Sequence, residues 1–132
     1  MHIDKTLSDF AYMILNLTQH QATPEQITLG VVEPSAEDKK TIQSILTFDE
    51  IPSKGELESR ANALAAFVTK MGCRKAMVGG APYLMSYLES ALKSKGISPV
   101  YAFSKRESVD QVQPDGSVRK VAVFRHAGWV EC

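Results

Sequence analysis

Three short polar stretches of the chain suit the binding of a phosphate, and each follows an apolar run that predicts a buried strand. They are Thr18-Gln19-His20, Gly79-Gly80 and Ser104-Lys105-Arg106. Hydroxyl, imidazole and cationic groups can donate hydrogen bonds or supply positive charge to an anion, and paired glycines let it approach the backbone. Because the carboxyl ends of parallel strands meet at one edge of a sheet, we expect the three stretches to form one site.

The Gly79-Gly80 pair stands where a predicted strand gives way to a helix led by Pro82. Backbone N–H groups at a helix N-terminus can hold an anion. Neither the phosphate-loop pattern GxxxxGK[ST] nor the dinucleotide pattern GxGxxG is present. Tight packing between strand and helix explains the glycines nearly as well as anion binding does, so the pair is informative only together with its neighbours.

Each of the other candidate groups also has a purely structural interpretation. Lys105-Arg106 alone is typical of a solvated basic pair, and His20 on a loop can be solvated or locally bonded. Arg125-His126 follows the last predicted strand, where it adds a second cationic pair or marks an exposed sheet end. Trp129 is expected in the core or at an interface rather than under a nucleic-acid base.

The residue inventory argues against a metal site and against a serine hydrolase. The histidines at positions 2, 20 and 126 show no HExxH or HxxxH spacing, and the two cysteines do not pair with them, so we expect no metal and no cofactor. The GxSxG pattern is absent. A basic and hydroxylic site suits recognition of a phosphodiester. It also suits a cleavage in which an RNA 2′-OH is the nucleophile and the protein supplies positioning and charge stabilisation.

Composition limits the partners that the chain can have. A length of 132 residues, 44% hydrophobic and 23% charged, predicts one globular domain with an ordinary core. Lys and Arg together equal Asp and Glu, so no overall field draws the chain to duplex nucleic acid or to a membrane, and we expect neither partner.

The expected location is the cytoplasm. Cys73 and Cys132 have no CxxC spacing, which favours reduced thiols. No apolar window reaches the length of a membrane span, and the N-terminus lacks a basic-then-apolar leader.

Strands that alternate with helices, followed by a hairpin, predict a three-layer α/β fold. The sheet should be Rossmann-like and mainly parallel, with right-handed crossovers and a C-terminal antiparallel hairpin around a Pro114–Ser117 turn. We expect one domain over residues 13–132, preceded by an extension over residues 1–12. Predicted strands span 13–17, 31–32, the run before Gly79 and 99–103, with the last hairpin strand at 118–124. Predicted helices begin after Thr23, at Ser35, near Glu56 and at Pro82.

Both ends of the chain resemble a small CRISPR-associated family. Residues 15–26, LNLTQHQATPEQ, resemble its opening, where a strand leads to a polar loop with a histidine and then to a TPEQ-type helix. Residues 97–106 (ISPVYAFSKR), the PDGSV of residues 114–118 and the VFRH of residues 123–126 resemble its ending more specifically. The middle matches weakly, through the Gly-Gly turn before a helix. That family is grouped with the CARF-like proteins, which have a CRISPR-associated Rossmann fold and several of which are ring nucleases.

The resemblance implies a homodimer that binds a cyclic oligoadenylate across its two-fold axis. It also implies metal-independent cleavage, by attack of a 2′-OH on the adjacent phosphate, which would switch off a second messenger of antiviral defence. In this interpretation His20, Lys105 and Arg106 are catalytic. The ligand-binding residues are then Thr18, Gln19, Gly79, Gly80, Ser104, Arg125 and His126.

Alternative functions remain open from the sequence. The same fold could sense a nucleotide without cleaving it and regulate a partner. It could also take another phosphate-containing ligand, act as a small phosphate-transfer enzyme, or serve only as an interaction protein whose glycines are needed for packing.

Overall fold

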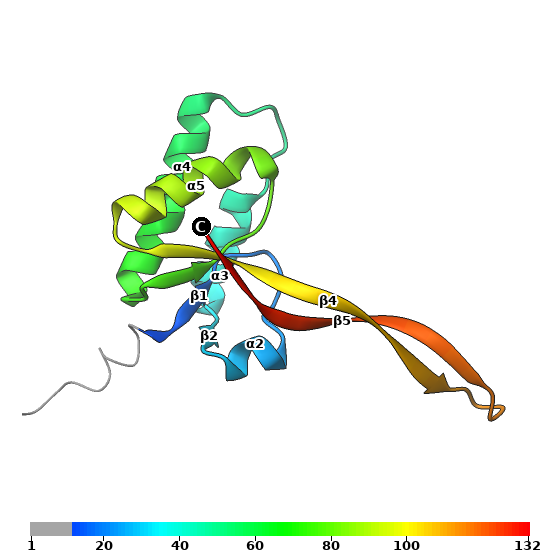
Figure 1. The fold of residues 1–132 in the computed structure, drawn as a ribbon. Coiled ribbons are helices and arrows are strands. Elements are labelled where there is room, and N and C mark those ends of the chain that lie inside the picture. The colour runs from blue at the N-terminus through cyan, green and yellow to red at the C-terminus, as the bar shows by residue number, and fades with distance from the viewer. Residues whose placement is uncertain (1–11) are drawn as a thin grey trace, which may run out of the picture.

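A computed structural model describes residues 12–132, so the predicted extension over residues 1–12 lies outside the described residues except for Tyr12. Five strands form one sheet in the order β2-β1-β3-β4-β5, and β5 alone runs antiparallel to its neighbour (Figure 1). The strands are β1 (Ile14–Asn16), β2 (Val31–Val32), β3 (Lys75–Met77), β4 (Ser98–Val112) and β5 (Val118–Glu131). The helices are α2 (Pro24–Thr28), α3 (Ala36–Leu46), α4 (Lys54–Met71) and α5 (Pro82–Ser94).

The strand order reverses direction at β1. The chain passes from β1 outward to β2, returns past β1 to β3, and continues to β4. This reversal makes the gap between β1 and β3 a topological switch point, and open α/β sheets bind ligands beyond the carboxyl ends of the strands at such a point. The predicted α/β fold, with a mainly parallel sheet and a C-terminal antiparallel hairpin, is confirmed.

The strand residues alternate between two apolar clusters on opposite faces of the sheet. Leu15, Ala76 and Val78 belong to the main core, together with the buried faces of α3, α4 and α5. Ile14 and Met77, one residue along, belong to a smaller cluster. In Figure 1, α4 and α5 lie on one side of the sheet and α2 lies on the other.

Thr23 and Gln26, three residues apart, predict a capping box at the start of α2, and the structure confirms it. The Gln26 N–H donates to the Thr23 hydroxyl (3.2 Å), and the Thr23 N–H donates to Gln26 Oε1 (3.0 Å). Pro24 occupies the first turn, where its missing N–H has no cost. This cap fixes the chain directly after the His20 loop.

The C-terminal hairpin is much longer than predicted. The sequence predicts that a strand ends at residue 103 and that Ser104-Lys105-Arg106 forms a loop. That prediction is wrong, because β4 continues without a break to Val112. The predicted end of the last strand, before Arg125-His126, is also wrong, because β5 continues to Glu131. Pairing between the two strands satisfies backbone groups that a loop would leave to water.

The hairpin of β4 and β5, which we call the ribbon, therefore projects well beyond the rest of the sheet (Figure 1). Its turn forms where predicted: the Gln113 N–H donates to the Ser117 carbonyl (2.7 Å), and Asp115 Oδ1 accepts from the Ser117 N–H (2.9 Å). The register shifts between Phe103 and Ser104, where β5 carries an extra residue.

None of the helices in the described range is long and apolar enough to cross a membrane.

Candidate functional site

The loop after β1 and the joint after β3 touch at the switch point. The Leu17 N–H donates to the Met77 carbonyl (2.9 Å), which extends the pairing of these strands. Beyond this bond, a Cβ built on Gly79 would lie 3.5 Å from Cγ2 of Thr18. Two of the three predicted stretches, Thr18–His20 and Gly79-Gly80, are therefore brought together.

A fully buried asparagine shapes the loop after β1. Asn16 Oδ1 accepts from the backbone N–H of Thr18 (2.9 Å) and from its hydroxyl (2.7 Å). Asn16 Nδ2 donates to the His20 carbonyl (2.7 Å) and to Glu33 Oε1 (2.8 Å). The Thr18 hydroxyl is thus engaged within the loop, so Thr18 orders the loop through this bond.

Glu33, one residue after β2, completes this buried network. Its Oε1 also accepts from the Ala22 N–H (2.7 Å), and its Oε2 forms an ion pair with Lys39. Burial is the largest single influence on the Glu33 pKa and raises it. The hydrogen bonds from Lys39, Asn16 and Ala22, with the Lys39 charge, outweigh burial and hold the pKa below its usual range.

Sequence reasoning did not single out Asn16, Glu33 or Lys39. The available signal was a polar residue inside an apolar run, since Asn16 interrupts the first strand. The network holds the backbone of the loop and leaves the His20 side chain exposed at the sheet edge. Gln19 Nε2 donates to the Thr47 hydroxyl (3.0 Å), which ties the loop to the segment after α3.

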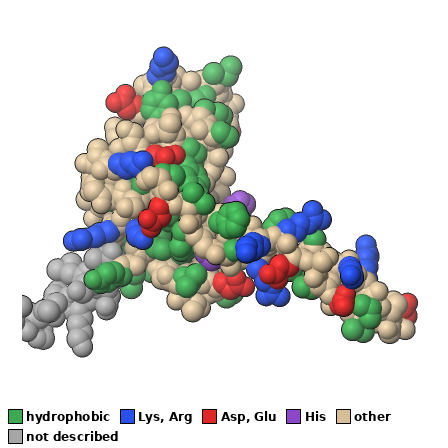
Figure 2. Space-filling model, in the orientation of Figure 1, with side chains coloured by type: hydrophobic (Ala, Val, Ile, Leu, Met, Phe, Trp, Pro, Cys, Tyr) green, Lys and Arg blue, Asp and Glu red, His purple; other side chains and the backbone are tan. Residues whose placement is uncertain are grey.

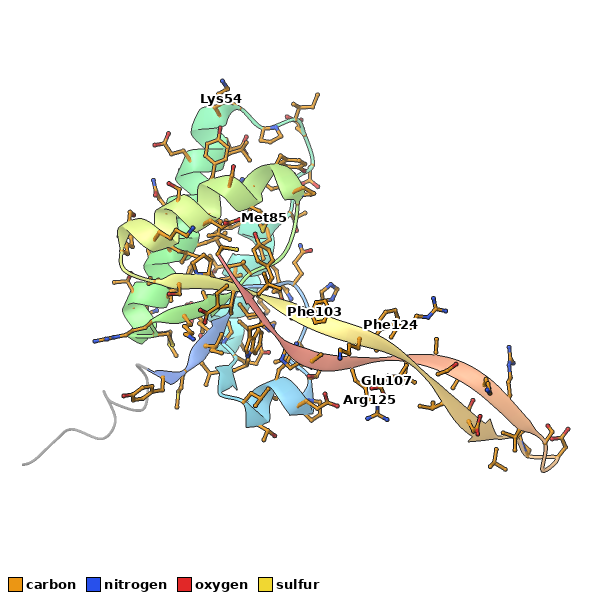
Figure 3. The ribbon with its side chains drawn as sticks, in the orientation of Figure 1. Lys54, Met85, Phe103, Glu107, Phe124 and Arg125 are labelled. Carbon is orange, nitrogen blue, oxygen red and sulfur yellow. The ribbon has the colours of Figure 1, made fainter. Side chains whose placement is uncertain are left out.

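The joint between β3 and α5 offers unpaired backbone donors. Within residues 12–132, the N–H groups of Gly79, Gly80 and Ala81 donate to no protein acceptor. Ala81 is the N-cap of α5 and makes no side-chain hydrogen bond with the first turn. Gly80 has a φ angle of +146°, which residues with a side chain rarely adopt, and a Cβ there would lie 3.6 Å from Met85 Cε. Figure 3 marks Met85 on α5. Unpaired N–H groups next to a helix N-terminus are the groups that bind anions in other proteins.

A groove of about 490 Å³ lies close to this joint, between the segment after α3 and the first turn of α5. Sequence reasoning missed it. Two of its aromatic rings meet edge to face, Phe48 and Tyr83, with centroids 5.2 Å apart. The Arg60 guanidinium lies 4.2 Å from the Phe48 centroid and is held by the Thr47 carbonyl (2.6 Å). The lining residues are Phe48, Asp49, Glu50, Ile51, Pro52, Leu57 and Tyr83.

The third predicted stretch lies on the projecting ribbon and not in a loop beside Thr18 and Gly79. Within the ribbon, Lys105 pairs with Arg125 and Arg106 pairs with Phe124. Arg125 Nε lies 2.8 Å from Glu107 Oε2, and Figure 3 shows these two side chains next to each other.

The remaining two predicted site residues, Ser104 and His126, lie opposite each other at the base of the ribbon. The His126 ring lies 4.5 Å from the Trp129 ring, and its Nδ1 lies 3.4 Å from Gln26 Nε2. Its Nε2 is buried without a hydrogen-bond partner in the described part of the chain. His126 therefore joins β5 to α2, and its ring packs on Trp129 beside the smaller apolar cluster.

No three His, Cys, Asp or Glu side chains among the described residues are grouped so that they could hold a metal ion.

Fold and site together define a doubly wound α/β protein with a candidate anion site at its switch point. The chain belongs to the uncharacterized protein MJ1673 family, whose family model matches residues 12–130. No curated protein and no solved structure was found to match. The description of the family states no activity, so the function must be argued from the site itself.

The Glu33 network predicts a dependence of stability on pH. Because the folded state lowers the Glu33 pKa, its ionisation stabilises the protein above the unfolded-state pKa of about 4.5, and this contribution is lost as the pH falls through the folded-state value. Glu33→Gln should lower the free energy of unfolding at pH 7 by about 1–3 kcal/mol. It should also flatten the loss of stability below about pH 4.5.

Chemical denaturation at pH 7 and pH 3.5 measures both effects. The control is Glu58→Gln, which changes an exposed acid on α4 and should change neither. Equal loss of stability in the two variants would contradict the role of Glu33.

Proposed function

We propose that the protein binds a phosphate-bearing nucleotide, of the cyclic oligoadenylate type, at the edge between β1 and β3. The observation that carries this proposal is the contact of the Thr18 loop with Gly79 at the switch point. The Asn16 network already fixes the loop, so little conformational freedom remains to be lost when a ligand binds. The resemblance of the chain ends to CARF-like proteins supports the choice of ligand class.

The phosphate contact would come from the backbone. The N–H groups of Gly79, Gly80 and Ala81 can donate to phosphate oxygens, and the missing side chain at Gly79 leaves the space beside Thr18 open. The Gln19 and His20 side chains, exposed on the facing loop, can add further donors.

The aromatic groove gives the base a place next to the phosphate. Tyr83 lies only three residues after Gly80 and is 51% exposed. A base stacked on such a ring contributes about 1–3 kcal/mol. Asp49 and Glu50, which also line the groove, can accept hydrogen bonds from the exocyclic amine of an adenine. We call the turn over Gly79, Gly80 and Ala81 the cradle. A cradle for phosphate beside an aromatic groove supports a nucleotide as the ligand rather than a simple phosphate.

Cleavage of the ligand is a second candidate, favoured by the exposed His20 imidazole beside the proposed cradle. In this reaction the ribose 2′-oxygen attacks the adjacent phosphorus and the 5′-oxygen leaves, which gives a 2′,3′-cyclic phosphate and a 5′-hydroxyl. His20 would accept the 2′ proton or donate one to the leaving oxygen. Lys105 is proposed to supply positive charge from the ribbon.

Two substitutions test the binding site. Gly79→Val fills the space beside Thr18, and Tyr83→Ala removes the stacking surface, so each should weaken the binding of cyclic tetra- or hexa-adenylate by about tenfold or more. Isothermal titration calorimetry measures the affinity.

The matched control is Tyr12→Ala, an exposed ring that precedes β1 and so lies at the end of that strand opposite the switch point. It should bind as the parent chain does. Unchanged affinity in Gly79→Val and Tyr83→Ala would place the ligand elsewhere.

The cleavage candidate has its own assay. The protein is incubated with each cyclic oligoadenylate, with and without EDTA, and the products are separated by chromatography. Linear products that end in a cyclic phosphate, insensitive to EDTA and reduced at least tenfold by His20→Ala, are expected for cleavage. Intact ligand with a rise in the melting temperature of the protein supports the sensor instead. The absence of both cleavage and a thermal shift would contradict the whole proposal.

A further inference from the structure

The ribbon has a free backbone edge where β3 ends. The last β3–β4 pair is Met77 with Val100, whereas β4 continues to Val112. The Val78 N–H donates to the Val100 carbonyl and the Ser98 N–H to the Arg74 carbonyl, so even-numbered β4 residues direct their backbone groups to this side. By strand alternation, Ser104, Arg106, Ser108 and Asp110 continue the same edge without a partner strand in the described chain.

The ribbon also exposes large apolar side chains. Phe103 is 50% exposed, Phe124 74%, Val112 72% and Val118 61%. Figure 2 shows hydrophobic side chains between Lys, Arg and acidic groups along the projecting ribbon. A two-stranded ribbon without a third strand or a packed face is marginally stable in water, and free edges favour pairing with another chain.

We propose that two copies of this chain pair through their free β4 edges, antiparallel, about a two-fold axis at Ser108. The product is a four-stranded antiparallel sheet in the order β5-β4-β4-β5. Two ribbons that are marginal alone would then support each other and cover part of their apolar surface.

The charges on β4 select this register. An axis at Ser108 puts Arg106 opposite the partner's Asp110, twice per dimer, and puts even-numbered residues opposite even-numbered ones, so that donors meet acceptors. An axis at Glu107 would place that carboxylate opposite its own copy. An axis at Arg106 or at Asp110 would likewise oppose two identical charges, and an axis at Val109 would form no opposite-charge pair.

The outer edge of β5 is a poor alternative. Its charged residues from Val118 to Val130 are all basic: Arg119, Lys120 and Arg125. Because this stretch contains no acid, a two-fold pairing of β5 with its copy over Val118 to Val130 forms no opposite-charge pair in any register and gathers basic side chains along one edge, which disfavours association.

The register has a consequence for the proposed ligand site, and this consequence alone rests on the proposed function. The partner's Val112 lies opposite Ser104, so the partner's turn points toward the end of β3, where Gly79 begins the cradle. The turn is flanked by two basic residues of β5, Arg119 and Lys120. These two residues of the partner would bring positive charge to the proposed ligand site. Lys39, on the same edge of the sheet, is already in an ion pair with Glu33.

Cross-linking tests the axis directly and needs no ligand. The probe is Ser108→Cys in a Cys132→Ser background, since Cys132 is exposed and Cys73 is buried. Opposed residues of a hydrogen-bonded antiparallel pair have Cα atoms about 5.5 Å apart, so a short bismaleimide should convert most of the full-length chain to a covalent dimer. Ala122→Cys, which pairs with Ser108 within one ribbon but lies on the outer strand, should remain monomeric. Equal cross-linking of both variants, or of neither, would overturn the proposal.

A charge exchange tests the register. Arg106→Asp and Asp110→Arg each replace attraction by repulsion at both contacts, so each should weaken the dimer about tenfold in sedimentation velocity. The double variant restores opposite charges and should recover the parent affinity, which also shows that the ribbon still folds. Arg119→Asp on the outer strand is the control. A parent chain that is monomeric at all concentrations, or a dimer that resists both reversals, contradicts the pairing.

Discussion

The buried amide of Asn16 is the interaction on which the candidate site depends. It lies at the last position of β1, at the switch point. Its Oδ1 accepts hydrogen bonds from Thr18 and its Nδ2 donates to the His20 carbonyl, so both polar atoms bond to the loop that follows, and Nδ2 also donates to Glu33. A buried amide without partners would be destabilising, so the loop must close around it in one conformation. Glu33 and Lys39 complete the network from the neighbouring strand and helix. The loop held in this way faces Gly79, where a Cβ would lie 3.5 Å from Cγ2 of Thr18.

The two halves of the proposed site have different physical characters. The Gly79–Ala81 turn offers backbone N–H groups and no side chain that could clash, whereas the nearby groove offers aromatic faces and carboxylates. The first suits a phosphate and the second suits a base. Neither half contains a strong unpaired cation, since Arg60 is held by backbone carbonyls and by Glu56. Positive charge from the ribbon would remedy this, which links the proposed site to the proposed pairing of two chains.

Much of the fold could be predicted from the sequence because its local signals agree with the tertiary structure. The Thr23 cap, the Gly72 helix end and the apolar stripe of α4 each specify an element on their own. The length of β4 could not be predicted in this way. Residues 104–108 are polar and have weak strand preference, and only cross-strand pairing with β5 makes them a strand.

The candidate site was predictable only in its backbone. The loop at Thr18 and the joint at Gly79 follow from strand ends that must share an edge. The Asn16–Glu33–Lys39 network requires β1 and β2 to be paired before its members meet, and the Phe48–Tyr83 groove joins segments far apart in the chain. No local pattern encodes such contacts, and sequence reasoning placed the cations Lys105 and Arg106 on a loop that the structure shows to be part of β4.

We propose above all that the turn between β3 and α5 binds the phosphate of a nucleotide. The most direct measurement is a titration of the ¹⁵N-labelled chain with cyclic tetra-adenylate, followed by amide chemical shifts. We predict the largest changes at the N–H groups of Gly79, Gly80 and Ala81, with smaller ones in the Thr18–His20 loop. Saturable binding that leaves these amides unchanged, or no binding at all, would contradict it.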